Sequence, residues 1–233
     1  MKELIQKIGL AWLLRGYKTI TMKFPQFKNR STSEIFTIIY KKNKWKSTES
    51  ISGRGSELKQ TGSLVKELGK LLHDLDIRSV LDIPCGDLSW MQRIDLSKIQ
   101  YTGADIVEDL VEKNREQFKD KGNFEFKLID LINAPLPKND IIIIRDCLVH
   151  FSFADIFKAL ENIRSSGCTY LLTTTFPKHP ANYNIATGEW RTINLQEKPF
   201  NFPPPLFVIN ENCAENNGKY NDKSMALWKI SEV

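Results

Sequence analysis

Four consecutive isoleucines, Ile141 to Ile144, constrain the fold of this chain more than any other feature of its sequence. β-Branched side chains favour a strand, in which successive side chains point to opposite faces of the sheet. A run of four therefore presents apolar groups to both faces, and only a strand covered on both sides keeps them from water. We expect a central strand of a largely parallel sheet within residues 139–148.

Strands and helices alternate around this run. Short apolar segments alternate with segments whose apolar residues recur at helical spacing, which predicts βαβ units with right-handed crossovers. Two late strand-like segments have no long helix between them and predict an antiparallel pair that closes the sheet. The expected strands are 79–83, 101–106, 124–131, 139–148, 169–176, 205–212 and 223–230, and the expected helices are 33–46, 63–76, 108–120 and 153–166.

Composition limits the classes of protein to consider. The chain has 233 residues, 41% of them hydrophobic and 26% charged, which predicts one ordinary globular domain with an appended segment. Its four cysteines form no Cys-x-x-Cys pair, and its three histidines have no metal-pair spacing. We therefore expect no disulfide framework, no metal site and a reducing, cytoplasmic location.

Basic residues gather at the N-terminus. Residues 1–46 hold eleven Lys/Arg and two Glu, a net +9 against +5 for the whole chain, so the remainder carries −4. Such a leader indicates an anionic surface, a polyanion or a flexible solubilising arm. The apolar run 4–14 is too short to span a membrane, but its spacing favours an amphipathic helix. That helix would pack on its own domain or, alternatively, make a peripheral membrane contact through residues 1–20.

Acidic residues stand at four consecutive strand ends: Asp82, Asp105, Asp130 and Asp146. The carboxyl ends of parallel strands meet at one edge of the sheet, where such folds bind ligands. One strand-end aspartate is often only a helix cap, but four together indicate a ligand site.

The residue types at this edge suit an adenosine-like ligand. Asp105 can accept hydrogen bonds from both ribose hydroxyls, and Asp130 from an adenine amino group. Gly86 lets the backbone approach the ligand, while Asp82 would face an ammonium or order the turn. A G-x-G-x-x-G motif is absent and Asp87 follows the only glycine of the turn, which argues against a dinucleotide pyrophosphate.

These segments resemble a known superfamily. "VLDIPCGDLSWM", "GADI", "IDL" and "IIIIRDCLVHF" are similar to the motifs of class I S-adenosylmethionine-dependent methyltransferases, over roughly residues 60–230. The wider pattern, including "SISGRGSELKQT", "LLTTTF" and "NFPPPL", also resembles a group of bacterial methyltransferase-domain proteins. Pro84 and Leu88 stand where glycines are common in the first motif of the superfamily.

The resemblance implies a Rossmann-like, doubly wound, seven-stranded and mostly parallel sheet with an antiparallel last strand. It implies S-adenosylmethionine as cofactor, a basic N-terminal segment over 1–60 that includes a helical lid, and a methyltransferase domain over 61–233. A plain flexible linker is the alternative to the lid. The cofactor contacts that it implies are Trp45, Gly53, Ser56, Asp82, Pro84, Cys85, Gly86, Asp87, Asp105, Ile106, Asp130, Leu131, Arg145 and Cys147.

His150 and Asp146 are the candidate catalytic residues. An imidazole after the fourth strand could take a proton from an acceptor hydroxyl, or could simply pack against the next helix. Asp146 could contact the acceptor. The 177–205 segment, too long for an ordinary connection, is expected on the acceptor side or as an ordered structural loop. Its candidate substrate contacts are Tyr183, Trp190 and Arg191.

We therefore expect a methyltransferase acting on a hydroxyl of a small molecule or of a saccharide or envelope-glycan precursor. Two alternatives stay open. A nucleic-acid methyltransferase would use the basic leader on phosphates, although the acidic remainder argues against it. A cofactor-binding interaction module would bind without turnover. A nicotinamide oxidoreductase is disfavoured by the missing glycines, and "NFPPPL" (201–206) is expected to be a rigid turn.

Overall fold

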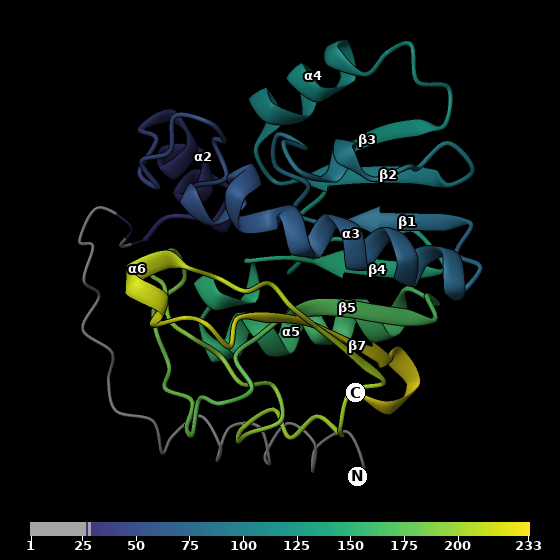
Figure 1. The fold of residues 1–233 in the computed structure, drawn as a ribbon. Helices are drawn as coiled ribbons and strands as arrows, with labels where there is room; N and C mark the ends of the chain where they lie inside the picture. Colours follow the sequence, from purple (N-terminus) through teal and green to yellow (C-terminus); the bar gives the residue numbers. More distant parts are fainter. Residues whose placement is uncertain (1–26, 28) are drawn as a thin grey trace, which may run out of the picture.

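A seven-stranded mixed sheet in the order β3-β2-β1-β4-β5-β7-β6 forms the centre of the computed structural model, which describes residues 27 and 29–233 (Figure 1). β1 to β5 are parallel, and β7 is antiparallel to both β5 and β6. The sheet predicted from the alternation of elements is therefore confirmed. The strands are β1 (Ser79–Asp82), β2 (Gln100–Asp105), β3 (Phe124–Leu128), β4 (Ile141–Ile144), β5 (Tyr170–Thr175), β6 (Phe207–Asn210) and β7 (Ser224–Lys229).

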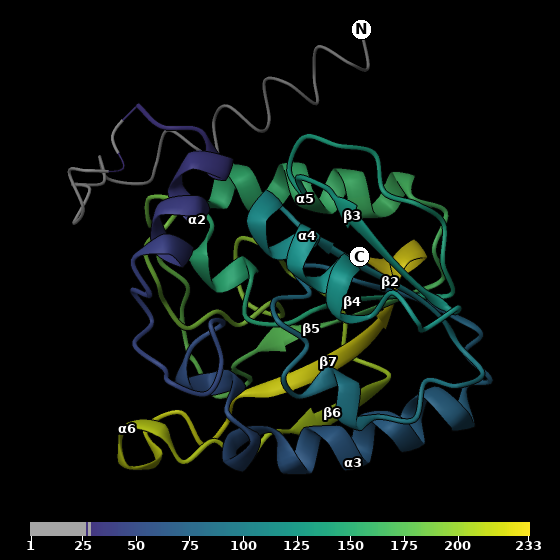
Figure 2. The ribbon, with the colours of Figure 1, turned by 90° about the horizontal axis from the view of Figure 1, so that it is seen from above.

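The isoleucine run is β4, and all four of its side chains are fully buried. Ile142 and Ile144 face the core that contains α5 (Phe153–Ser165). Ile141 and Ile143 face the opposite core, which contains α3 (Leu58–Asp74). Figure 2 shows these two helices on opposite sides of the sheet. The two-faced burial expected from the sequence is thus what fixes β4 at the centre.

The helices agree with the expected ones except at their ends. α4 (Glu108–Gln117) packs into the same core as α3, through Val111. α3 begins five residues before the expected start, because Gln60 and Thr61 are buried and extend its inner face. Residues 58–62, which precede the expected start, are therefore helical as well. Short 3-10 helices cover Arg54–Ser56, Met91–Arg93, Leu148–His150 and Ile230–Glu232, and α6 spans Glu215–Gly218.

The N-terminal helix α2 (Thr32–Lys41) begins at a capping box. The Ser31 hydroxyl accepts from the Glu34 N–H at 3.2 Å, and the Glu34 carboxylate accepts from the Ser31 N–H at 2.7 Å. This reciprocal pair satisfies two of the donors left free at a helix start. The expected helix over 33–46 is therefore found, but it is shorter and ends at Lys41. The amphipathic helix and membrane contact expected for residues 1–20 lie outside the described residues.

α2 bridges two parts of the molecule. On one side the Lys113 ammonium donates to the Tyr40 hydroxyl at 2.7 Å, which ties α2 to α4. On the other side Ile35 packs so tightly against Gly188 that a Cβ there would lie 2.6 Å from Ile35 Cγ2. The helix therefore rests on α4 and on the 177–205 segment together.

The 177–205 segment has no regular secondary structure, yet it is ordered by buried polar contacts. The guanidinium of Arg191 is fully buried and donates to the carbonyl oxygens of Leu148, Val149 and Phe151 at 3.0 Å and of Tyr183 at 3.1 Å.

Within residues 27 and 29–233, no helix has the length and apolar character needed to cross a bilayer.

Candidate functional site

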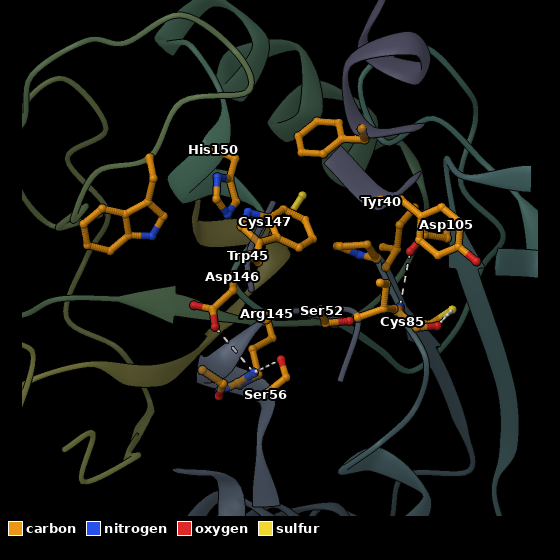
Figure 3. Close-up of a pocket in the computed structure, with 18 of the residues that line it drawn as sticks. Tyr40, Trp45, Ser52, Ser56, Cys85, Asp105, Arg145, Asp146, Cys147 and His150 are labelled. Atoms are coloured by element: carbon orange, nitrogen blue, oxygen red, sulfur yellow. Dashed lines mark hydrogen bonds and ion pairs between the residues drawn. The ribbon is translucent and has the colours of Figure 1, made fainter. Parts of the chain in front are cut away.

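A cavity of about 380 Å³ opens at the carboxyl ends of the parallel strands. Figure 3 shows Asp105 and Cys85 on one side of it, His150 and Asp146 on the other, and Trp45 between them. Most of the predicted site residues are brought together here. Those that line the cavity are Trp45, Gly53, Ser56, Pro84, Cys85, Gly86, Asp105, Ile106, Asp130, Leu131, Arg145, Asp146, Cys147, His150 and Trp190.

We call the side formed by Pro84–Gly86, Asp105–Val107 and Ile129–Leu131 the nucleoside wall. There the Asp105 carboxylate accepts from the Gly86 N–H at 3.2 Å and from the Val107 N–H at 3.0 Å. Burial raises the pKa of Asp105 to about 6, against the lowering effect of these backbone hydrogen bonds. The carboxylate is thus held rigidly with the lone pairs not used by the backbone available to a ligand.

Gly86 has φ +58° and lies directly under Ser52, so a Cβ would collide with the Ser52 hydroxyl. Its carbonyl accepts from the Asn114 side chain at 2.7 Å. Leu88, in place of a motif glycine, also has positive φ (53°) and is buried. The turn thus keeps the backbone conformation that a glycine favours, although the side chain differs.

Asp130 forms a local cap, and its expected contact with the adenine amino group stays a prediction. Its carboxylate accepts from the Ile132 N–H at 2.9 Å and from the Asn133 amide at 2.7 Å, which is a local cap. The residue still lines the cavity, beside Leu131.

Asp82 and Asp87 were expected to contact the cofactor, and neither lines the cavity. Asp82 is buried and accepts from the Tyr101 hydroxyl at 2.6 Å, while burial raises its pKa to about 7. Asp82 was expected either to face an ammonium of the ligand or to order the turn. Because it does not line the cavity, only the second role is compatible with its position. Asp87 instead accepts from the Ser50 hydroxyl and the Ile51 N–H, both at 2.9 Å. It holds the loop that covers the cavity.

That loop and α2 both line the cavity, through Ser52 and Tyr40, and we call the two together the lid. Their expected closure over a cofactor stays a prediction. The Trp45 ring lies 5.4 Å from the His150 ring, centre to centre. Gly53 has φ +96°, and a Cβ there would lie 2.8 Å from the Trp45 Cβ. The tryptophan is therefore seated on a position that only glycine leaves open.

Arg145 joins the lid to the sheet. Its buried guanidinium makes a two-pronged contact with the Glu211 carboxylate, at 3.0 and 2.7 Å, and donates to the Ser56 hydroxyl at 3.1 Å and the Gly55 carbonyl at 2.7 Å. Burial lowers the pKa of Arg145, but the Glu211 and Asp146 carboxylates outweigh that effect and raise it. Its donors are thus committed to protein acceptors.

Lys223 and Glu211 were not predicted. The Lys223 ammonium lies 2.5 Å from an Asp146 carboxylate oxygen and 3.2 Å from one of Glu211. Burial opposes ionisation of Asp146, yet the attraction of Lys223 and Arg145 outweighs it and lowers the pKa of Asp146 to about 2. Glu211 directly follows β6, so the strand-end rule applied to the sixth strand would have found it.

His150 has one nitrogen fixed and one free. Its Nδ1 lies 2.8 Å from the Glu189 carbonyl oxygen, which can only accept, so Nδ1 carries the proton. Nε2 has no hydrogen-bond partner among the described residues. Every buried polar side-chain atom in that part of the chain has such a partner, so Nε2 is not itself buried and is open to the cavity that His150 lines. Burial lowers the pKa of His150, despite the opposing effects of the Glu189 carbonyl and Asp146. The imidazole is therefore neutral at pH 7.

The opposite side, which we call the C-terminal wall, comprises Phe176, Trp190, Cys213, Glu215, Tyr220 and Lys223. Of the three expected substrate contacts, only Trp190 belongs to the cavity. Tyr183 lies outside the cavity and is half exposed, and the buried Arg191 binds the backbone carbonyl oxygens described above.

Within the described part of the chain, no three His, Cys, Asp or Glu side chains are placed to hold a metal ion.

Comparison with known proteins places this site in context. Residues 81–166 match a family model described as a methyltransferase domain. A search of curated proteins finds no match.

Several solved structures share the fold. N-methyltransferase NodS from Bradyrhizobium japonicum WM9, in complex with S-adenosylhomocysteine, has a TM-score of 0.56 at 10% identity, covering 82% of this chain and 97% of that one. Magnesium protoporphyrin IX methyltransferase from Synechocystis PCC 6803, with bound S-adenosylmethionine, has a TM-score of 0.51 at 17% identity, covering 67% and 82%. The chain spans 43% of a further match, a possible exported protein from Bordetella parapertussis (TM-score 0.42, 15% identity, 50% of this chain).

Proposed function

We propose that this chain, a member of the class I S-adenosylmethionine-dependent methyltransferase superfamily, transfers a methyl group to a hydroxyl of a small molecule or saccharide. One observation carries the choice of a hydroxyl. The free Nε2 of a neutral, buried histidine opens into the same cavity as the nucleoside wall. A base so placed is needed for a hydroxyl, which must lose a proton during transfer.

The nucleoside wall fits the cofactor by the chemistry of its donors and acceptors. The fixed Asp105 carboxylate suits a pair of ribose hydroxyls, and the bare backbone at Gly86 permits close approach. The cavity volume of about 380 Å³ falls in the range of small-molecule sites. When bound, S-adenosylmethionine supplies a methyl group already activated on a sulfonium.

His150 acts as the base in this proposal. Its Nε2 takes the proton of the acceptor hydroxyl as the oxygen forms its bond to the methyl carbon, and the Glu189 carbonyl keeps Nδ1–H in place. The carboxylate of Asp146 favours the resulting imidazolium, since it raises the pKa of His150. Trp45 and the lid loop keep water from the reacting atoms.

The first test is calorimetric titration with S-adenosylmethionine, S-adenosylhomocysteine and NAD in parallel. Micromolar binding of the first two without NAD supports the proposal, and NAD binding alone contradicts it. Transfer of a labelled methyl group to hydroxylated small molecules and sugars is then measured. Cofactor binding without transfer to any acceptor favours the interaction module, and salt-sensitive transfer to nucleic acid favours that substrate instead.

A further inference from the structure

We propose that the acceptor carries a protonated amine besides its reacting hydroxyl. This cation binds between Trp190, Tyr220 and Glu215 of the C-terminal wall and the neighbouring Asp146 carboxylate. The inference rests on the proposed function, since it concerns the acceptor for that reaction. It adds a recognition group on the opposite side of the cavity from the nucleoside wall.

Three aromatic rings from separate parts of the chain meet on this wall. The ring centres of Trp190 and Tyr220 lie 5.1 Å apart, and both rings contact Phe176 edge-on, at 6.4 and 6.2 Å. Trp190 is 41% exposed although it contacts both partners, so a large ring surface remains uncovered. The faces of aromatic rings attract cations, and tryptophan does so most strongly among them.

The C-terminal wall itself has no basic side chain free to pair with an anionic ligand. The buried guanidinium of Arg145 is paired with Glu211, and the buried ammonium of Lys223 lies between Glu211 and Asp146. Arg54, the remaining basic residue of the lining, is on the lid loop and donates to the Lys46 carbonyl. Lys219 is not part of the lining, and its ammonium lies 5.8 Å from the centre of the Tyr220 ring.

The carboxylates of Asp146 and Glu215, in contrast, can still accept a hydrogen bond or an ion pair from a ligand. Only one oxygen of Asp146 is engaged by Lys223 and Arg145, and its side chain remains 27% exposed. Glu215 lines the cavity and makes no ion pair within the described residues; its one side-chain partner there is the weak Cys213 thiol donor, at 3.8 Å. The charges of Asp146, Glu211, Glu215, Arg145 and Lys223 sum to −1. A positive group is therefore the one that this wall can neutralise.

The free nitrogen of His150 supplies an independent sign that a polar ligand belongs here. The side chain is more than nine-tenths buried, and its Nε2 is left to be satisfied from the cavity. A neutral hydroxyl can donate to it, whereas an ammonium is better placed against the aromatic rings and the carboxylates. The combination indicates an amino alcohol or amino sugar and argues against a phosphorylated or carboxylated acceptor.

The test compares three sugars with the same gluco-configured ring skeleton. The protein saturated with S-adenosylhomocysteine is titrated with glucosamine, glucose and glucuronate, at a pH where the amine is protonated. Glucosamine is expected to bind about tenfold or more tightly than glucose, and glucuronate the weakest, as cation–π and ion-pair contacts predict. The proposal is overturned if glucose binds as tightly as glucosamine, or if glucuronate binds more tightly than glucosamine. It is also overturned if glucosamine does not bind to the protein loaded with S-adenosylhomocysteine.

Variants locate the effect. Glu215→Gln removes the charge alone and should weaken glucosamine binding about tenfold without changing that of glucose. Trp190→Phe should retain most of the affinity, and Trp190→Leu should lose it. Glu161→Gln, at an exposed α5 position, is the matched control. An unchanged glucosamine-to-glucose ratio in Glu215→Gln contradicts the assignment. Saturation with S-adenosylhomocysteine precedes every sugar titration. Failure of the protein to bind S-adenosylhomocysteine would refute the proposed function itself, separately from the result with the sugars.

Discussion

The proposed ribose contact requires Asp105 to be ionised in a place where burial opposes ionisation. Burial raises its pKa to about 6, and only the ionised carboxylate can accept hydrogen bonds through both oxygens. Because the folded pKa lies above the ordinary value, the protonated form gains population as the pH falls through 6. The proposed contact with the ribose hydroxyls uses the ionised form, so cofactor binding should then release a proton to solvent.

We therefore expect the dissociation constant for S-adenosylhomocysteine to be constant above about pH 7 and to rise, by about tenfold per unit at the limit, below pH 6. Titration calorimetry from pH 5 to 8 measures it. Asp105→Asn should weaken binding at least about tenfold, roughly 1.4 kcal/mol, and remove the pH dependence. Unchanged affinity in a folded Asp105→Asn protein would reject the ribose assignment.

His150→Gln tests the base. The amide can still donate to the Glu189 carbonyl, but it cannot accept the proton, so turnover should fall about 100-fold while S-adenosylhomocysteine affinity stays the same. In the unmodified protein, turnover should decline only below pH 6.5, because burial lowers the pKa of His150. Steady-state rates and calorimetry measure the two effects, and undiminished turnover would return His150 to a packing role.

At the scale of single residues, the sequence identified the strand-end acids because topology alone brings such positions together. Asp105, Asp130 and Asp146 all line the cavity. It failed for Tyr183 and Arg191, because an irregular segment has no periodicity from which to tell an inward residue from an outward one. Arg191 is polar and yet fully buried, since four carbonyl oxygens replace its water.

Among the elements, the lid loop depends on one carboxylate that does not touch the cavity. Asp87 accepts from the Ser50 hydroxyl and from the Ile51 N–H. Asp87→Ala should therefore increase amide hydrogen exchange across 50–56 and weaken cofactor binding several-fold, with the nucleoside wall itself unchanged. Hydrogen-exchange mass spectrometry and calorimetry measure the two.

Asp95→Ala is the control for this lid variant. Asp95 makes a similar local turn, accepting from the Ser97 N–H at 3.0 Å, but it is exposed and holds no lid residue. Exchange and affinity should stay at their original values in Asp95→Ala. Equal effects of the two substitutions would mean that a lost turn, and not a loosened lid, is responsible.

Strands were easier to predict than the segments around the lid. The β-branched run of β4 has one low-energy solution, a strand buried on both faces. The start of α3 was placed too late because Gly62 and Ser63 favour a break locally, whereas the buried Gln60 and Thr61 extend the helix. Tertiary contacts, which a local pattern does not contain, decided that boundary.

Over the whole molecule, a group of four charges, three of them buried, joins the end of β4, the end of β6 and the start of β7. Glu211 is its centre, since it contacts both Arg145 and Lys223 and is almost fully buried. Glu211→Gln leaves two buried cations facing one carboxylate, and we expect it to lower the free energy of unfolding by about 3–5 kcal/mol. Urea unfolding measures the change against Glu161→Gln. A loss below about 1 kcal/mol, as for an exposed pair, would contradict the role assigned to Glu211.

The overall sheet could be predicted because alternation of elements leaves few topologies. The charged group could not, because Arg145, Glu211 and Lys223 become neighbours only once β6 and β7 are in place. The expected cytoplasmic location and the membrane contact through residues 1–20 stay predictions from the sequence.

The two walls of the cavity come from different stretches of the chain. The nucleoside wall lies within residues 84–131, whereas every residue of the C-terminal wall follows β5. Under the proposed function, residues of the C-terminal wall can therefore change acceptor preference without disturbing the nucleoside wall, whereas Asp146 and His150, which follow β4, stay outside this exchange. A chimaera that exchanges the stretch after β5 would have to carry Arg191 and Glu211 with it, because these two residues contact Val149 and Arg145 in the segment that follows β4.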